Sequence, residues 1–444
     1  MTETDPTRAL RDTLIKETFE WCKAKSPFYQ NRFAEISTFS GLADLYRIPV
    51  LTRSEVVANH KDICCDPSLP TSVQFTTGTT GQYLHLYRGQ AEQAFIWEFF
   101  SAQLQASPPP DVKPLCMNLV NVYHGNLINV PSRAFVLPVG VFDRAQATQA
   151  RSLLERTYDF PGVENRISTL SGTERMVMAL TAYLMAEGVD LARSSVKRIV
   201  LFGGHVPSSR KKLLSELWQA QITDQYSLTE IFGGAKEYGP DGTWLFDPHV
   251  VPEVVHPVTH KLITEGVGVL VLSELYPFVQ QMPMLRYFTG DLVTIVQGAD
   301  APGGLQVRYL GRLVRSILDT SGPEVKPLLL SGPLYSALID IPDIAVSPRF
   351  PDLNAGPGLE LTGDLHYAIE HRPAEVSRVE EITIRLGLRY APWMYSDRVA
   401  EVVDKLVTRL FETHPEMASR CAAKTLKLQV LPCHATAVPP YDSK

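Results

Sequence analysis

Six consecutive residues in the first quarter of the chain combine the properties of a phosphate-binding turn. The segment reads T-T-G-T-T-G and consists of Thr76, Thr77, Gly78, Thr79, Thr80 and Gly81. Glycines let backbone N–H groups converge on one point, and the hydroxyls add donors, so such a turn can wrap around phosphate oxygens. It is not a Walker loop, because no lysine follows Gly81. Taken alone, the segment is equally compatible with an ordinary Thr/Gly-rich loop.

A second set of residues could hold a nucleotide base and a metal ion. Gly203 and Gly204 follow the apolar run 198–202, where paired glycines would let a flat ring approach the backbone closely. Further along, Tyr226 could stack on a base. Glu230, four residues later, carries a carboxylate that could hold a magnesium ion.

Two more chemical candidates come from the middle of the chain. Asp291 follows a Thr-Gly turn, so its carboxylate is expected to point out of the sheet edge and accept hydrogen bonds from ribose hydroxyls. Tyr123 and His124 directly follow an apolar run, where they could line a pocket. The alternative for this pair is a packed tyrosine and a surface histidine.

Local patterns predict the elements that position these residues. Helices are expected over 8–37, with a break at Pro27, and over 91–105, 331–341 and 396–416. A short helix is expected to begin after Thr52, its N-cap, with Glu55 completing a capping box. Another is expected to begin at a Ser208 or Ser209 cap and to end at Trp218. Strands are expected to end near Phe75 and to cover 115–122, 198–202, 244–255, 266–272, 285–292, 309–312, 379–386 and 425–431.

Composition limits the class of protein. A chain of 444 residues predicts two domains, and 45% hydrophobic with 20% charged residues is typical of a globular protein. The net charge of -6 argues against nucleic-acid binding, and no apolar run is long enough to span a membrane. The polar, acidic start is not that of a signal peptide. Six scattered cysteines predict buried thiols in a reducing compartment, the cytoplasm, without a structural metal.

Four motifs in a fixed order carry a family resemblance. They read T-T-G-T-T-G, Y-S-L-T-E, Y-F-T-G-D-L and L-G-R, and they resemble the adenylate-forming superfamily of acyl-CoA ligases, closest to its phenylacetate-CoA ligase-like subgroup. The phrases S-P-F-Y and I-P-V-L-T-R support the subgroup, and the resemblance covers essentially the whole chain. It implies an α/β fold, with a large N-terminal adenylating domain of mixed sheets and helices (1–312) and a small α+β C-terminal lid domain (313–444).

The resemblance also implies a role for each matching residue. The turn 76–81 would hold the ATP phosphates, Gly203 and Gly204 would flank the adenine, and Tyr226 would stack on it. Thr229 would help hold the α-phosphate, and Glu230 would bind Mg²⁺. Asp291 would bind the ribose hydroxyls, with Arg312 beside the ribose at the domain boundary. The carboxylic acid would lie in a pocket formed by Tyr123, His124, Phe202 and His205.

The chain departs from the family pattern at three places. The family's catalytic lysine follows a P-R-x-x-G-K phrase, whereas here P-P-Y-D-S-K puts Lys444 at about that position. A charged tail without a catalytic role is the alternative for this lysine. The acidic hinge residue of G-R-x-D is missing, because the chain reads Gly311-Arg312-Leu313-Val314-Arg315 there. The Pro-Lys that usually follows the phosphate loop is also missing.

The resulting hypothesis is an ATP- and Mg²⁺-dependent ligase. It would activate a carboxylic acid, aromatic by subgroup resemblance, to an acyl-adenylate with release of pyrophosphate, and would then transfer the acyl group to coenzyme A. An amine or a carrier-protein thiol is the alternative acceptor, because the hinge and the tail depart from the family. A nucleotide-binding protein without catalysis is a third reading, against which Glu230, Asp291 and Arg312 speak. A small-molecule acid is the expected partner, neither nucleic acid nor membrane is expected, and a homodimer is expected from the resemblance alone.

Overall fold

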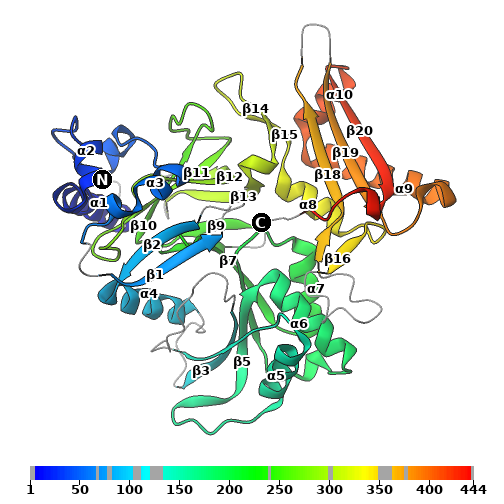
Figure 1. The fold of residues 1–444 in the computed structure, drawn as a ribbon, viewed down its shortest axis with the longest axis horizontal. Helices are drawn as coiled ribbons and strands as arrows, with labels where there is room; N and C mark the ends of the chain where they lie inside the picture. The colour runs from blue at the N-terminus through cyan, green and yellow to red at the C-terminus, as the bar shows by residue number, and fades with distance from the viewer. Residues whose placement is uncertain are drawn as a thin grey trace.

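The computed structural model describes residues 6–66, 70–77, 83–103, 112–120, 134–238, 242–298, 304–348, 363–374 and 379–441. A long sheet runs through the centre of the molecule in the strand order β10-β11-β12-β13-β9-β8-β7-β6-β5-β3-β4 (Figure 1). Its parallel half contains β3 (Lys113–Leu119), β4 (Phe135–Val139), β5 (Val163–Thr173), β6 (Arg198–Phe202) and β7 (Gln221–Ser227). The antiparallel half contains β8 (Gly234–Tyr238), β9 (Thr243–Phe246), β10 (Val250–Val255), β11 (Val267–Glu274), β12 (Tyr287–Gln297) and β13 (Gln306–Arg312).

Three helices cover one face of the parallel half. They are α5 (Arg144–Glu155), α6 (Glu174–Ala186) and α7 (Ser208–Trp218), and they lie beside β3 and β5 in Figure 1. Leu115, Leu170 and Leu201 from three neighbouring strands are fully buried in the core that these helices share with the sheet. Burial of such apolar side chains is the main source of stability for this layer. This packing holds the carboxyl ends of the parallel strands in place. Ligands of α/β sheets bind at such strand ends.

The N-terminal segment packs against the antiparallel half. It contains α1 (Pro6–Lys25), α2 (Pro27–Arg32), α3 (Arg53–Ile63), the hairpin β1 (Pro70–Thr77) and β2 (Tyr83–Gly89), and α4 (Gln90–Gln103). The predicted break at Pro27 is confirmed. The predicted capping box is also confirmed, since the Thr52 hydroxyl accepts from the Glu55 N–H and the Glu55 carboxylate accepts from the Thr52 N–H.

The chain after Arg312 builds a second, smaller core. It contains η4 (Leu313–Arg315), β14 (Ile317–Asp319), β15 (Lys326–Leu329), α8 (Ser331–Ile339), β16 (Val346–Pro348), β17 (Gly363–Leu365), β18 (Tyr367–Arg372), β19 (Glu380–Leu388), α9 (Ser396–Thr413), α10 (Pro415–Ala422), β20 (Leu426–His434) and η7 (Ala435–Ala437). Figure 1 shows β18, β19 and β20 with α9 and α10 as a separate group of elements beside the central sheet. The α/β fold class is confirmed, whereas the division at Arg312 stays a prediction.

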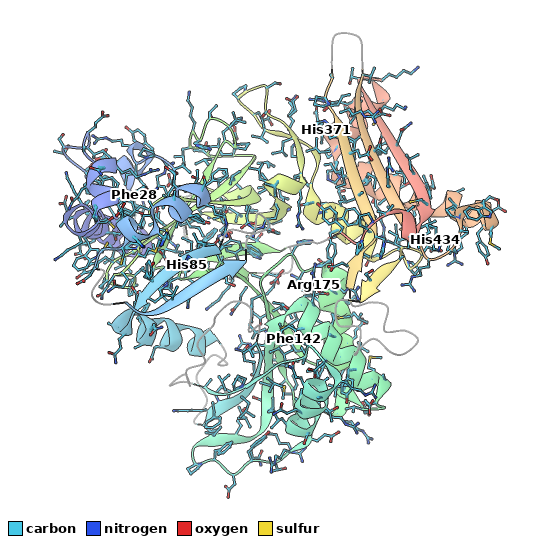
Figure 2. The ribbon with its side chains drawn as sticks, in the orientation of Figure 1. Phe28, His85, Phe142, Arg175, His371 and His434 are labelled. Carbon is cyan, nitrogen blue, oxygen red and sulfur yellow. The ribbon has the colours of Figure 1, made fainter. Side chains whose placement is uncertain are left out.

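One ion pair joins this smaller part to the rest. Arg175 at the start of α6 lies 3.0 Å from the Asp364 carboxylate of β17. Figure 2 labels Arg175 where α6 meets the strand β16. The two parts are thus held together by polar contacts as well as by the chain itself.

Three predicted elements differ from the structure. The segment 244–255 is two strands, because Pro248 lacks the N–H that a continuing strand would use, and β9 and β10 are not neighbours in the sheet. The helix over 396–416 is interrupted, because Pro415 disfavours helical geometry at His414 (φ −131°, ψ 73°). Neither Ser208 nor Ser209 caps α7: the helix begins at Ser208, and its N-cap residue is Pro207, without a side-chain cap.

The cysteines largely follow the prediction. Cys22, Cys64, Cys65 and Cys116 are buried, and Cys421 and Cys433 are only half-buried. All six are free thiols. Among the described helices, none combines the length and the apolar character that crossing a membrane requires.

Candidate active site

Asp291 lies at a bulge in β12. Gly290 has a φ of +72°, a backbone conformation that glycine adopts most readily. The Thr289 hydroxyl accepts a hydrogen bond of 3.0 Å from the Asp291 N–H, which fixes the bulge. The prediction that Asp291 points out of a sheet edge is wrong, because β12 is an interior strand between β11 and β13 and the residue is 2% exposed.

The Asp291 carboxylate gathers three donors. The Tyr226 hydroxyl donates to Oδ2 at 2.8 Å, and the Tyr309 hydroxyl donates to Oδ1 at 3.3 Å. The Arg312 guanidinium lies 3.1 Å from Oδ1 and also donates to the Thr289 carbonyl at 3.0 Å. A carboxylate offers about four acceptor positions, so three donors leave room for a ribose hydroxyl. Three residues predicted separately, Tyr226, Asp291 and Arg312, therefore lie in one hydrogen-bonded group.

Charge in this group is arranged for anion and hydroxyl binding. Burial raises the pKa of Asp291, and the Arg312 guanidinium beside it opposes that effect. In turn the Asp291 carboxylate raises the pKa of Arg312, which therefore stays cationic. Burial and the same carboxylate raise the pKa of Tyr226 well above its usual value, so its hydroxyl keeps its proton and remains a donor. Arg312 is 40% exposed at its side chain, and it can meet a solvent-borne ligand.

A row of ring contacts connects this group with the turn after β6. Trp244 packs against Tyr226 at 5.0 Å and stacks on Tyr309 at 5.4 Å between ring centroids. The His205 ring stacks on the Tyr309 ring, with 5.9 Å between the ring centroids. The Nε2 atom of His205 lies 2.8 Å from the Ser336 hydroxyl of α8. Burial lowers the pKa of His205 to about 4, so the imidazole is neutral at physiological pH.

The turn before His205 has the predicted form. Phe202 ends β6 and is half-buried, and Gly203 follows with a φ of +83°. Gly203 and Gly204 are exposed. His205 therefore lies close to Asp291, because Tyr309 contacts both residues.

Glu230 lies in the turn after β7 and is already paired. The Arg53 guanidinium is 2.8 Å from Oε1, and the Tyr287 hydroxyl donates to the same oxygen at 3.2 Å. Thr229, beside it in the turn, is half-buried. The Glu230 side chain is 11% exposed, so it is not completely closed off from solvent.

The donor set around Glu230 fits Mg²⁺ that is shared with a phosphate-bearing ligand. Among the residues that the structure describes, no three His, Cys, Asp or Glu side chains come together as a metal cage. Mg²⁺ commonly takes one or two carboxylates and completes its shell with substrate phosphates and water. A single, partly accessible carboxylate is compatible with that mode of binding.

A buried ion pair holds the backbone of the Glu230 turn. Arg88 on β2 and Glu274 at the end of β11 are 1% and 0% exposed and lie 3.6 Å apart. Arg88 donates to the Glu230 carbonyl at 3.4 Å, and the Glu274 carboxylate accepts from the Phe232 N–H at 2.5 Å and the Met284 N–H at 2.9 Å. Burial raises the pKa of Glu274 to about 7. The position of Glu230 thus depends on charges in the core.

Several predicted site residues lie outside the described part of the chain. They are Gly78, Thr79, Thr80, Gly81, Tyr123, His124 and Lys444. Thr76 and Thr77 are the last residues of β1, whose backbone pairs with β2. The turn 76–81 thereby begins at the tip of a hairpin, and Arg88 in the second strand of that hairpin contacts the Glu230 turn.

Sequence reasoning missed four residues of the site: Arg53, Tyr287, Tyr309 and Arg88. Arg53 and Tyr287 stand inside the phrases I-P-V-L-T-R and Y-F-T-G-D-L, and Tyr309 directly precedes L-G-R. Only Tyr287 stands near a recognised acidic residue, four positions before Asp291. Arg88 has no comparable signal in the sequence.

Comparisons with known proteins point to one class of enzyme. The chain is 26% identical over 355 residues to a phenylacetate-coenzyme A ligase of Thermus thermophilus, which covers 76% of each protein. It is 24% identical over 150 residues to a phenylacetate-coenzyme A ligase of Pseudomonas putida, 31% of this chain and 33% of that protein. Its fold matches an open conformation of 2-hydroxyisobutyryl-CoA ligase in complex with 2-HIB-AMP and CoA, with a TM-score of 0.66, 16% identity, and coverage of 99% of this chain and 90% of that one. No protein-family model matches.

Fold, site and relatives together define the class. The chain is similar to the phenylacetate-CoA ligases and has the fold of an acyl-CoA ligase of the adenylate-forming superfamily. It is an adenylate-forming ligase.

Proposed function

We propose that this protein uses ATP to convert a carboxylic acid to an acyl-adenylate, releases pyrophosphate, and passes the acyl group to coenzyme A. The observation that carries the proposal is the Asp291 group, in which Tyr226, Tyr309 and Arg312 converge on one carboxylate. Such a carboxylate, with an acceptor position to spare, suits a ribose diol. The turn that presents Glu230 follows directly from the strand that carries Tyr226.

The chemistry requires positioning more than a protein nucleophile. An oxygen of the substrate carboxylate attacks the α-phosphorus of ATP, and the bond from that phosphorus to the pyrophosphate oxygen breaks. Two anions must approach each other, so donors and cations fixed in advance contribute most to the rate. A thiol of coenzyme A then attacks the acyl carbonyl and displaces AMP.

The described residues divide these tasks. Asp291 would bind the ribose, with Arg312 beside it, while Tyr226 and the backbone at Gly203 and Gly204 would enclose the adenine. Glu230, helped by Thr229, would hold Mg²⁺, which supplies positive charge to the phosphates when bound. The turn 76–81 would hold those phosphates, and Lys444 would reach the reacting carboxylate and the α-phosphate. Residues 1–312 would form the adenylating domain and 313–444 the lid.

An aromatic acid is the finer part of the proposal. It is supported by the similarity to phenylacetate-CoA ligases and by the half-buried Phe202 at the end of β6. Phe202 and His205, with Tyr123 and His124, would line the acid pocket. Its partners would be a small-molecule acid and a second copy of the chain in a homodimer.

An amine or carrier-protein thiol is the second candidate for the acceptor. The observation that favours it is the missing acidic hinge residue, because Val314 stands at the last position of the family's G-R-x-D. Coenzyme A thioester formed at high kcat/KM would count against this alternative.

Acid-dependent ATP–pyrophosphate exchange tests the proposal. We expect exchange with at least one acid from a panel of arylacetic, benzoic, hydroxylated aliphatic and simple aliphatic acids. Lys444→Ala should lower the exchange rate by about 10²-fold, as loss of one charge-stabilising donor does. Folded protein that shows no exchange with any acid would refute the proposed function. Full exchange in the variant would refute only the role of Lys444.

Arg53→Gln is expected to lower the Mg²⁺ concentration that gives half-maximal exchange. Arg53 and Mg²⁺ would compete for the same oxygen of Glu230, and a partly exposed ion pair of this kind contributes about 0.2–1 kcal/mol. That range corresponds to a shift of up to about fivefold. Titration of Mg²⁺ at saturating ATP measures it. Arg47→Gln, which removes the surface pair with Asp44, is the matched control and should leave the Mg²⁺ titration unchanged; a higher Mg²⁺ requirement in Arg53→Gln would contradict the competition.

A further inference from the structure

The segment 46–50, which leads into α3, is held by two arginines that bind its backbone carbonyls. The Arg286 guanidinium donates from Nη1 to the Tyr46 carbonyl at 3.1 Å and to the Ile48 carbonyl at 2.6 Å. Arg32 on α2 donates to the carbonyls of residues 49 and 50, at 3.0 and 2.7 Å. Ile48 is fully buried, so the carbonyls here need partners inside the protein, and the two guanidinium groups supply them.

Arg286 is buried and has an unusual backbone conformation. It is 3% exposed, and its φ of +55° lies in the left-handed region, which a residue with a β-carbon rarely adopts. Its Nε lies 2.9 Å from the Glu253 carboxylate of β10, and its N–H donates to the Ser273 hydroxyl at 2.9 Å. Such a conformation persists only where the surroundings fix it. Here the ion pair, the bond to Ser273 and the two carbonyls fix it together.

The backbone of Arg286 joins the start of α3 to the start of β12. The Leu51 N–H donates to the Arg286 carbonyl at 2.8 Å, and the Phe288 N–H donates to the Leu51 carbonyl at 2.8 Å. Leu51 thereby forms a parallel β-bridge with Tyr287, and it is fully buried. Two residues later α3 begins at Arg53, and this helix lies beside β12 (Figure 1). The Leu51–Tyr287 bridge therefore fixes where α3 starts.

Both side chains that this bridge brings together contact Glu230. The Arg53 guanidinium lies 2.8 Å from Oε1, and the Tyr287 hydroxyl donates to the same oxygen at 3.2 Å. Two donors on one oxygen restrict the rotation of the carboxylate. A carboxylate that binds a metal ion depends on such orienting partners. The direction of the Glu230 carboxylate therefore depends on the Leu51–Tyr287 bridge.

We propose that Arg286 is a positioning residue for Glu230. The proposal rests on the proposed function, in which Glu230 holds Mg²⁺. Arg286 touches neither the metal nor the nucleotide in this role. It fixes the Leu51–Tyr287 bridge, and the bridge sets Arg53 and Tyr287 against the carboxylate. The phrases I-P-V-L-T-R and Y-F-T-G-D-L, which are far apart in the sequence, meet in this bridge.

Hydrogen–deuterium exchange on the full chain tests the bridge without any substrate. Arg286→Lys keeps a positive charge beside Glu253, but an ammonium group cannot reproduce the fork of donors that a guanidinium offers. In this variant the peptides that contain Leu51 and Phe288 should exchange about 2- to 10-fold faster, the range that loss of one hydrogen bond gives. Peptides from β18 and β19 should not change. Unchanged exchange at Leu51 and Phe288 would overturn the role of Arg286 in the bridge.

A second variant guards against misfolding. It combines Arg286→Gln with Glu253→Gln and removes both charges, so that neither is left unpaired in the core. Because it lacks the guanidinium, it should show the same faster exchange at Leu51 and Phe288. Full protection in this double variant would also overturn the proposal.

The Mg²⁺ titration of pyrophosphate exchange tests the link to Glu230. At saturating Mg²⁺ and ATP, Arg286→Lys should lower the rate about 10-fold, as loss of a residue that orients a metal ligand does. In the Arg286→Lys background, Arg53→Gln should shift the half-maximal Mg²⁺ concentration by less than about twofold, because Arg53 is no longer held at the carboxylate. A shift as large as the one that Arg53→Gln causes alone would overturn the positioning role, since Arg53 would then reach Glu230 without Arg286.

Arg420→Gln is the control for a general loss of stability. Arg420 on α10 pairs with Asp319, Glu380 and Glu416 in the smaller core, and the substitution removes all three ion pairs. It should keep the protection at Leu51 and the full shift caused by Arg53→Gln. Loss of either in the control would overturn the proposal, because the effect would then not be specific to Arg286.

The two proposals fail in different ways. If wild-type protein shows no pyrophosphate exchange with any acid, the proposed function is refuted and the role of Arg286 in it falls with it. The deuterium result then still decides whether Arg286 fixes the bridge. If wild-type pyrophosphate exchange is present and Arg286→Lys keeps both its rate and the full Arg53→Gln shift, only the positioning role is refuted.

Discussion

Glu230→Gln should reduce acid-dependent pyrophosphate exchange by about 10²–10³-fold while leaving the fold intact. The amide keeps an acceptor for Arg53 and Tyr287, which both contact Oε1. It removes the negative charge that would hold Mg²⁺ against the phosphates, and the metal contributes several kcal/mol to stabilisation of the transition state. The pair with Arg53 is partly exposed, so its loss changes the free energy of unfolding by less than about 1 kcal/mol.

The measurement is the exchange rate over a Mg²⁺ titration, with thermal unfolding of the same samples. Glu155→Gln is the control, because Glu155 also pairs with an arginine (Arg151, 2.9 Å) but ends α5, in the helical layer over the parallel half of the sheet. It should keep near wild-type exchange. A Glu230→Gln protein that retains more than about a third of the rate at every Mg²⁺ concentration would remove Glu230 from the metal site.

The central group of the site could be predicted from the sequence because its members stand at recognisable ends of strands. Tyr226 is the penultimate residue of β7, and Arg312 is the last residue of β13. Asp291 was assigned to the same nucleotide site because its motif, Y-F-T-G-D-L, stands between the motifs of Tyr226 and Arg312 in the family order. What the sequence could not give is the strand order, in which β12 is interior and its carboxylate is buried rather than at an edge.

The contacts that hold the site were beyond prediction because they join distant segments. Arg53 and Glu230 are 177 positions apart, and Arg88 is 142 positions from the carbonyl to which it donates. Neither pairing leaves a local pattern, since each cation stands in an otherwise ordinary helix start or strand. The helix break at His414 was predictable in principle, because Pro415 is in the sequence.

Glu274→Ala should lower the free energy of unfolding by about 3–5 kcal/mol at pH 8. Arg88 and Glu274 are both fully buried, and removing one partner of such a pair leaves an uncompensated charge in the core. The same change leaves the Phe232 and Met284 N–H groups without the carboxylate oxygens to which they donate. Urea denaturation measures the loss. Glu216→Ala, which removes an exposed i,i+4 pair with Lys212, is the control and should change stability by less than about 0.5 kcal/mol.

The pH dependence of stability provides an independent check on Glu274. Burial raises its pKa from 4.5 to about 7, so between these values the folded protein holds a proton that the unfolded chain has released. The free energy of unfolding therefore falls as the pH rises through this window, by at most about 1.4 kcal/mol per pH unit from this group. Glu274→Gln cannot titrate, and its stability should fall less steeply than that of the wild type between pH 4.5 and 7. Parallel curves for the two proteins would mean that Glu274 is ionised throughout, with Arg88 outweighing burial.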